Sequence, residues 1–286
     1  MPLVFIFLTL SMLLLWLPPA RTGYFAHAWL LAFIMAVGLG LYDGQLDVIA
    51  LIPFSLFAIS VYYFQRLGGM ARLPVGMAIV LLSLALGLHL FPGFHNPLIV
   101  EHVRLGSDTL PYTLRLNFDK AVIGLFILLG LRPLLAGRRE TLLMLQQLVP
   151  IALVTFGAVV GLSLLLGYIR FDVKLPGFIG YWLWANLFFT CLAEEALFRG
   201  FLQRQLAIRL ATFRYGAWFA LVACALLFGI AHAAGGIKYI FLATVAGLGY
   251  GWAYHRTQRI EASILLHFTL NSLHILLFSY PALTSR

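Results

Sequence analysis

Long apolar segments constrain the fold of this 286-residue chain more than any other feature. Polar breaks separate them, and several reach the roughly 18 residues that a bilayer-spanning helix needs. The ten segments are 3–18, 24–42, 47–64, 75–91, 120–136, 149–168, 178–203, 216–233, 237–255 and 261–280. The sequence therefore predicts an all-α fold, a polytopic transmembrane bundle of about ten helices.

The composition excludes an ordinary soluble domain. Hydrophobic residues make up 62% of the chain and charged residues 10%, whereas soluble domains carry about 25% charged residues. The net charge is +9, but the basic residues lie between apolar segments, where the preference of Lys and Arg for cytoplasmic loops explains them. We therefore expect a multi-pass integral membrane protein whose partner is the lipid bilayer and not nucleic acid.

The longest connection covers residues 93–119, and the charge pattern predicts that it lies on the external, non-cytoplasmic side of the membrane. Its stretch TLRLNFDK alternates apolar and polar residues, which favours a short extended segment. We predict that residues 1–140 form accessory transmembrane helices. Residues 145–282 are then a second bundle, which carries the polar residues described next.

Two adjacent carboxylates, Glu194 and Glu195, lie in the sequence EEALFRG, directly after the uncharged run YWLWANLFFTCLA. A carboxylate inside a membrane costs about 2.5–3.5 kcal/mol on insertion scales, so such an acid indicates function. On an α-helix Arg199 lies about 40° round from Glu195 and can pair with it. It lies about 140° round from Glu194, so an ion pair at a helix end accounts for Glu195 and leaves Glu194 unexplained.

Two later apolar segments supply further polar residues. FGIAH places Phe228 and His232 four residues apart, on one helix face, so that the phenyl ring can pack beneath the imidazole. HFTLN places His267 and Asn271 in the same way. A single histidine in an apolar helix is more often a packing residue. Together with Glu194, however, these residues must find polar partners in lipid, so we expect one shared chamber.

The ordered motifs EExxxR, FxxxH and HxxxN resemble those of the CAAX-protease and bacteriocin-processing family of intramembrane glutamic endopeptidases. The eukaryotic members of that family are the type II CAAX prenyl endopeptidases. Each motif lies on an apolar segment of the carboxy-terminal part of the chain. The motif residues are Glu194, Glu195 and Arg199, then Phe228 and His232, then His267 and Asn271.

The resemblance implies a role for each motif residue. Glu194 is expected to act as the general base that takes a proton from water, and His232 to assist it. His267 and Asn271 are expected to hold the oxyanion that forms on the scissile carbonyl. Supporting roles are expected for Glu195, Arg199 and Phe228.

The resemblance also implies partners and location. The expected substrate is a protein or peptide in or at the membrane, cleaved at a leader, a sorting tail or a CAAX-like end. No cofactor and no metal ion is expected. Bacterial relatives of this kind indicate the inner or plasma membrane.

Three alternatives stay open at the level of sequence. Cys191 lies three residues before Glu194 and could serve a Cys–His protease. Glu194, His232 and His267 could together bind zinc, although the chain contains no HExxH motif. The polar residues could also line the path of a transporter, or belong to a non-catalytic membrane scaffold.

The stretch GLGYG places Gly247 and Gly251 four residues apart. No strand precedes it, so it is not a nucleotide-binding loop. Small residues at this spacing let a neighbouring helix approach closely. We therefore predict a tight helix contact on this face.

Overall fold

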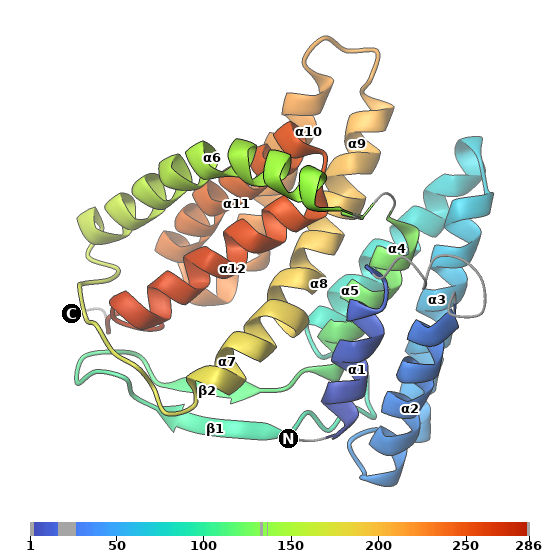
Figure 1. Ribbon diagram of the computed structural model, residues 1–286, viewed down its shortest axis with the longest axis horizontal. Coiled ribbons are helices and arrows are strands. Elements are labelled where there is room, and N and C mark those ends of the chain that lie inside the picture. The colour runs from blue at the N-terminus through green and yellow to red at the C-terminus, as the bar shows by residue number, and fades with distance from the viewer. Residues whose placement is uncertain (1–2, 17–26, 132–133, 136, 285–286) are drawn as a thin grey trace. The chain divides into compact units, whose positions relative to one another are not determined.

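The computed structural model describes residues 3–16, 27–131, 134–135 and 137–284 (Figure 1). Within them, helices account for most of the chain. They are α1 (Leu3–Leu13), α2 (Ala28–Tyr42), α3 (Leu51–Arg66), α4 (Arg72–Gly87), α5 (Phe118–Gly130), α6 (Arg138–Leu165), α7 (Ile179–Ala185), α8 (Leu192–Glu195), α9 (Arg204–Arg209), α10 (Gly216–Ala231), α11 (Ile237–Thr257) and α12 (Ile260–Leu277). The π-helical stretches between α7, α8 and α9 join these three into one helix without a break. Counted in this way, the described residues form ten helices, as predicted.

Four helical segments of the described chain are long and apolar enough to cross a membrane. They are Val48–Arg66, Gly69–Gly87, Arg138–Leu165 and Ile260–Leu277, and three shorter apolar helices accompany them, Leu3–Leu13, Ala28–Tyr42 and Gly216–Ala231. Many of their large side chains are exposed, as lipid-facing side chains are. The chain is an integral membrane protein.

Two details differ from the sequence prediction. Strands β1 (Leu98–Val103) and β2 (Tyr112–Arg115) pair as a small two-stranded sheet within a mostly helical fold, which remains consistent with the predicted all-α helical bundle. The predicted extended segment, residues 113–120, overlaps β2 only at Thr113–Arg115 and continues into α5, whereas β1 was missed. Helix α6 begins at Arg138 instead of residue 149, because charged and glutamine residues lower the hydropathy of its first three turns. Glu140 lies in the first turn, where the positive end of a helix favours an acid.

The chain forms two compact units. Unit 1 contains the described residues of 1–97, 115–136 and 188–197, and unit 2 contains those of 98–114, 137–187 and 198–286. Each unit thus combines segments from both sides of the division expected between residues 140 and 145.

In unit 1, helix α5 is the buried element, and it packs against α1, α3, α4 and α8. Nearly every side chain of α5 is buried. Aromatic rings join it to its neighbours: the Phe118 ring lies 6.0 Å from that of Phe5 and 5.5 Å from that of Phe54, and the Phe126 ring lies 5.4 Å from that of Phe33. These contacts hold the amino-terminal helices around α5.

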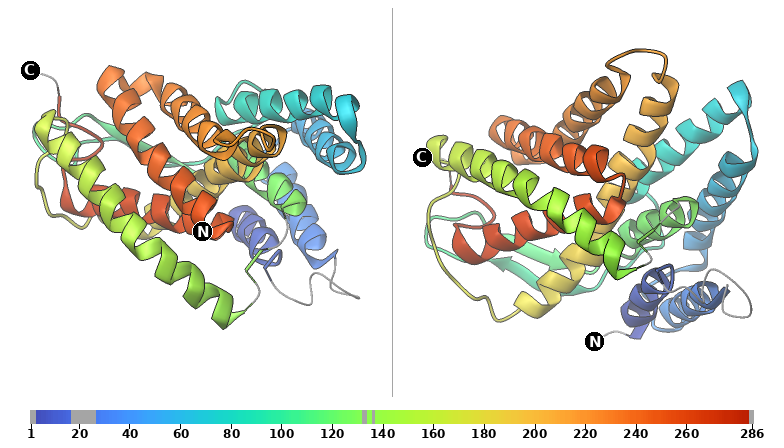
Figure 2. Two further views of the ribbon diagram at one scale, coloured as in Figure 1. Left: turned by 90° about the horizontal axis from the view of Figure 1, so that it is seen from above. Right: turned by 45° about the horizontal axis from the view of Figure 1, so that its top comes forward.

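In unit 2, helix α11 packs against α6, α10 and α12 (Figures 1 and 2). Small residues bring the backbones together. A Cβ atom on Gly247 would lie 3.3 Å from Ala225 Cα, and one on Gly251 would lie 3.0 Å from Leu221 Cγ, both on α10. The predicted close approach of a helix to this face is therefore confirmed.

Gly229 of α10 gives the clearest test of this packing. A Cβ atom there would lie 1.9 Å from Thr244 Oγ1 and 2.7 Å from the carbonyl oxygen of Ile240, a backbone atom that cannot rotate away. We expect Gly229→Ala to lower the free energy of unfolding by about 1–3 kcal/mol, because overpacking forces the backbones apart. Thermal unfolding in detergent micelles, followed by circular dichroism, measures it.

Gly161 of α6 provides the matched control, because no atom lies within 4 Å of the place that a Cβ atom would occupy there. Gly161→Ala is expected to leave the melting temperature unchanged or to raise it, since alanine favours a helix by up to about 1 kcal/mol over glycine. Equal destabilisation by both substitutions would contradict a packing role for Gly229.

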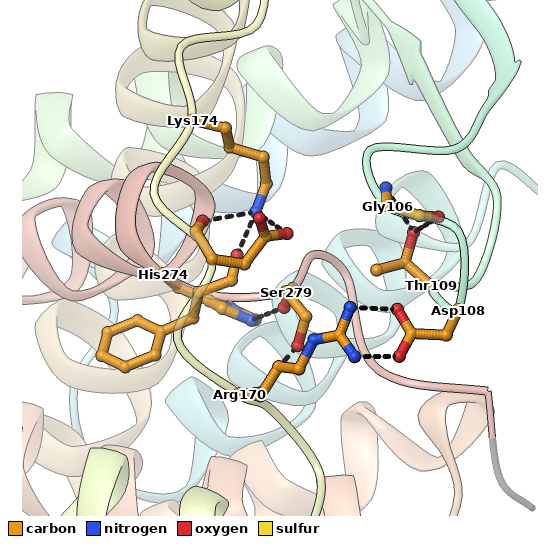
Figure 3. A network of polar contacts seen from close by, with 9 residues as sticks. Gly106, Asp108, Thr109, Arg170, Lys174, His274 and Ser279 are labelled. Carbon is orange, nitrogen blue, oxygen red and sulfur yellow. Dashed lines mark hydrogen bonds and ion pairs between the residues drawn. The ribbon is translucent and has the colours of Figure 1, made fainter.

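A polar network ties the carboxy-terminal segment of unit 2 to the loop before α7 (Figure 3). Lys174 Nζ donates to the carbonyl oxygens of Asp172 and Phe278 and to the Asp172 carboxylate. Arg170 pairs with Asp108, and its backbone N–H donates to Ser279 Oγ at 3.0 Å. The loop and the carboxy-terminal segment are thus joined by both backbone and side-chain bonds.

We expect Lys174→Met to destabilise this junction by about 1–3 kcal/mol, since hydrogen bonds to charged groups are the stronger ones. The backbone N–H groups of Asp172 and Ser279 donate hydrogen bonds across the junction, to Leu277 O and Arg170 O. In Lys174→Met these two groups should exchange with deuterium faster than in the unsubstituted protein. Lys238→Met, at an exposed lysine with one bond to Leu166 O, is the control. If exchange does not change at Asp172 and Ser279, Lys174 does not hold the junction.

Candidate active site

The two adjacent carboxylates lie on a helix of unusual geometry. Glu194 and Glu195 end α8, a single α-helical turn that lies between π-helical stretches at Asn186–Cys191 and Ala196–Gln203. π-Helical turns are rare and occur frequently at functional sites. Their bonds run from residue i to i+5, so the angles around the helix differ there from the α-helical ones, and the pairing of Glu195 with Arg199 stays a prediction.

Glu194 belongs to unit 1 and has a basic neighbour there that the sequence did not predict. Lys120 Nζ, on α5, lies 4.0 Å from Glu194 Oε1. Glu195, in the same unit, is fully buried. The hydropathy pattern did give a signal for Lys120, since it is a lysine at the start of an otherwise apolar segment.

Arg199 belongs to unit 2, where its side chain is fully buried. Its Nη2 donates to the carbonyl oxygen of Gly247 at 3.1 Å. Its guanidinium carbon lies 4.5 Å from the centre of the Phe228 ring and 5.2 Å from that of Tyr250. Cation–π attraction of this kind is strongest where water is excluded.

Phe228 also contacts both histidines of the predicted site. Its ring centre lies 4.5 Å from that of His232, one turn along, and 5.8 Å from that of His267 on α12. The predicted packing of Phe228 beneath His232 is therefore confirmed. Unit 2 brings these two imidazoles, from different helices, onto one aromatic ring.

The hydrogen bond at His232 determines its tautomer. Nδ1 lies 2.7 Å from the carbonyl oxygen of Phe228, which can only accept, so Nδ1 carries the hydrogen. The neutral ring then offers Nε2 as an acceptor. His232 is half-buried at the end of α10.

His267 and Asn271 lie one turn apart on α12. His267 is buried, and its ring stacks on Tyr250 at 4.5 Å with 17° between the planes. Asn271 Nδ2 donates to Asn186 Oδ1 at 3.4 Å. Sequence reasoning missed both Tyr250 and Asn186; Tyr250 lies in the GLGYG stretch, which was read only for its glycines.

The structure thus brings Arg199, Phe228, His232 and His267 together within unit 2, with Asn271 one turn from His267. Glu194 and Glu195 lie in unit 1, as does Cys191, whose side chain is fully buried. Among the described residues, no group of three or more His, Cys, Asp or Glu side chains is arranged to hold a metal ion.

Comparison with known proteins gives one family match. The family model described as type II CAAX prenyl endopeptidase Rce1-like matches residues 176–273, a segment that contains every motif residue. No curated protein and no solved structure matches the chain. Residues 176–273 of this chain are therefore similar to the type II CAAX prenyl endopeptidase Rce1-like family, in agreement with the resemblance that the three motifs indicated.

Proposed function

We propose that this chain is an intramembrane endopeptidase that hydrolyses a peptide bond with a water molecule activated by Glu194. The family description names an endopeptidase. Helices long and apolar enough to cross a membrane suit a substrate in or at the bilayer. The substrate is a membrane-associated or exported protein, cut near a leader, a sorting tail or a CAAX-like end. The proposed location is a bacterial inner or plasma membrane that the chain crosses several times.

One observation carries the proposal: His232 and His267, from different helices, pack against the same Phe228 ring. Polar groups are costly in a membrane protein interior and mark functional sites. Two imidazoles gathered on one ring, in a segment that matches an endopeptidase family, support a catalytic use for both. Glu194 is assigned the role of general base because it begins the EExxxR motif of the matched segment.

In the proposed reaction, the Glu194 carboxylate takes a proton from water while the water oxygen bonds to the scissile carbonyl carbon. His232 Nε2 accepts a hydrogen bond from that water and orients it. The carbonyl π electrons move to oxygen, and His267 and Asn271 stabilise the oxyanion. The C–N bond then breaks, Glu194 returns the proton to the leaving nitrogen, and no acyl-enzyme forms.

Asn186 supports Asn271 in this scheme. Its side-chain oxygen accepts from Asn271 Nδ2 at 3.4 Å, a long hydrogen bond that favours one orientation of the amide. An amide held in place before the reaction stabilises an oxyanion without reorganisation. Tyr250 does the same for His267 by stacking on its ring.

The test is to reconstitute the full chain in liposomes with a membrane-protein extract of its source cells. New amino termini are labelled and identified by mass spectrometry, and protein-free liposomes are the control. We expect one or a few specific new termini in membrane or exported proteins. A complete absence of new termini would favour a transporter or scaffold and overturn the proposal.

The same preparation separates the glutamic mechanism from a zinc-dependent one. We expect cleavage to persist after treatment with the chelator 1,10-phenanthroline, because no step of the proposed reaction uses a metal. Loss of cleavage on chelation, restored by added zinc, would instead support zinc held by Glu194, His232 and His267.

A further inference from the structure

Lys120 lies outside the segment that matches the endopeptidase family and beside Glu194. The Nζ–Oε1 distance is 4.0 Å, and the two side chains are 24% and 19% exposed. Both residues belong to unit 1. Because the attraction between opposite charges grows as water is removed, a pair this enclosed interacts more strongly than a pair on the surface.

A close contact between helices α5 and α8 places Lys120 beside Glu194. Gly124, one turn after Lys120 on the same face of α5, lies directly against α8. A Cβ atom on Gly124 would lie 2.3 Å from Leu192 Cδ2 and 3.3 Å from Ala193 Cα. The absence of a side chain at Gly124 therefore lets α5 approach the turn that ends in Glu194.

A polar cluster around the buried Asp119 fixes the start of α5. Asp119 is 1% exposed, and its carboxylate accepts from His89 Nδ1 at 2.6 Å and from Asn96 Nδ2 at 3.1 Å. Asn96 Oδ1 in turn accepts from the backbone N–H of Phe118 at 2.9 Å. Lys120 follows directly in the chain, so this cluster holds the backbone from which the lysine side chain extends.

We propose that Lys120 is a positioning residue for Glu194: its ammonium group keeps Glu194 a carboxylate and restricts its orientation. At 4.0 Å the ammonium lies beyond hydrogen-bonding distance of Oε1. It therefore attracts the carboxylate by charge and does not itself donate a hydrogen bond to Oε1. The inference rests on the proposed function, and it gives the amino-terminal helices a role in catalysis.

The first test is kinetic, with the full chain in liposomes and a synthetic peptide that spans a cleavage site found by terminal labelling. We expect Lys120→Met to lower kcat about 100-fold, the effect of a misplaced catalytic group, with KM nearly unchanged. Lys120→Arg, which keeps the charge, should retain most of the activity. Arg66→Met removes an exposed charge from the same unit and should behave as the unsubstituted protein does. A wild-type kcat in Lys120→Met would overturn the proposal.

The second test needs no substrate. Infrared difference spectra between each protein and its Glu194→Gln counterpart isolate the vibrations of Glu194. We expect the same Glu194 carboxylate band in the unsubstituted protein and in Lys120→Arg. In Lys120→Met this band should be shifted, or a carboxylic acid band should replace it. An identical carboxylate band in all three would overturn the role of Lys120.

The two tests distinguish failure of this inference from failure of the proposed function. Full peptide cleavage by Glu194→Gln would end the glutamic mechanism, while the infrared comparison would still decide whether Lys120 governs the state of Glu194. Lost cleavage in Lys120→Met with an unchanged Glu194 band would show that the lysine acts elsewhere, which contradicts the positioning role.

Discussion

Glu194→Gln is expected to lower kcat for peptide cleavage by about 10²–10⁴-fold, the usual contribution of a general base. Glutamine has nearly the same shape but cannot take a proton from water. The side chain is partly exposed within unit 1, so an isosteric amide fits without a new clash. We therefore expect the melting temperature to change little while the activity disappears, and both are measured on the same liposome or micelle preparation.

Two further variants make this result specific. Glu101→Gln makes the same chemical change at an exposed glutamate of β1 and should leave kcat unaltered. Cys191→Ala removes the buried thiol three residues before Glu194 and should also remain active. Full activity in Glu194→Gln would contradict the glutamic mechanism, and loss of activity in Cys191→Ala alone would favour a thiol nucleophile.

Hydropathy predicted the helical rods because segment length and apolar content determine which stretches can span a bilayer. It could not predict the π-helical stretches on either side of Glu194, because a change in backbone bonding leaves the hydropathy pattern unaltered. The angles assigned to Arg199 relative to Glu194 and Glu195 therefore change there, and the pairing of Arg199 with Glu195 stays a prediction. Spacing succeeded at Phe228 and His232, where the helix stays α-helical up to its last turn.

Contacts between residues that lie far apart in the chain were the second feature that the sequence did not predict. Lys120 meets Glu194 only because α5 lies against α8 at Gly124, and no motif in the sequence joins these segments. Asn186 reaches Asn271 in the same way, between the rod of α7–α9 and α12. The motif residues can be located in the sequence by their spacing, whereas the neighbours of Glu194 and Asn271 depend on packing.

Asn271→Ala is expected to lower kcat by about 10²–10³-fold, the cost of losing one oxyanion donor. The negative charge on the carbonyl oxygen exists only in the transition state and the tetrahedral intermediate. The lost interaction should therefore appear in kcat and leave KM nearly unchanged. Steady-state kinetics with the cleavage-site peptide measures both constants.

Three related variants determine how Asn271 acts. Asn271→Asp keeps the size but replaces the donor with an acceptor, so it should be at least as damaging as alanine. Asn186→Ala removes the group that orients Asn271 and should cause a smaller loss, because the donor is still present but less constrained. Ser272→Ala removes only a hydroxyl that bonds its own helix at Phe268 O and should be neutral. A rise in KM with kcat unchanged in Asn271→Ala would mean that Asn271 binds the substrate in its ground state, and the oxyanion role would then pass to other donors.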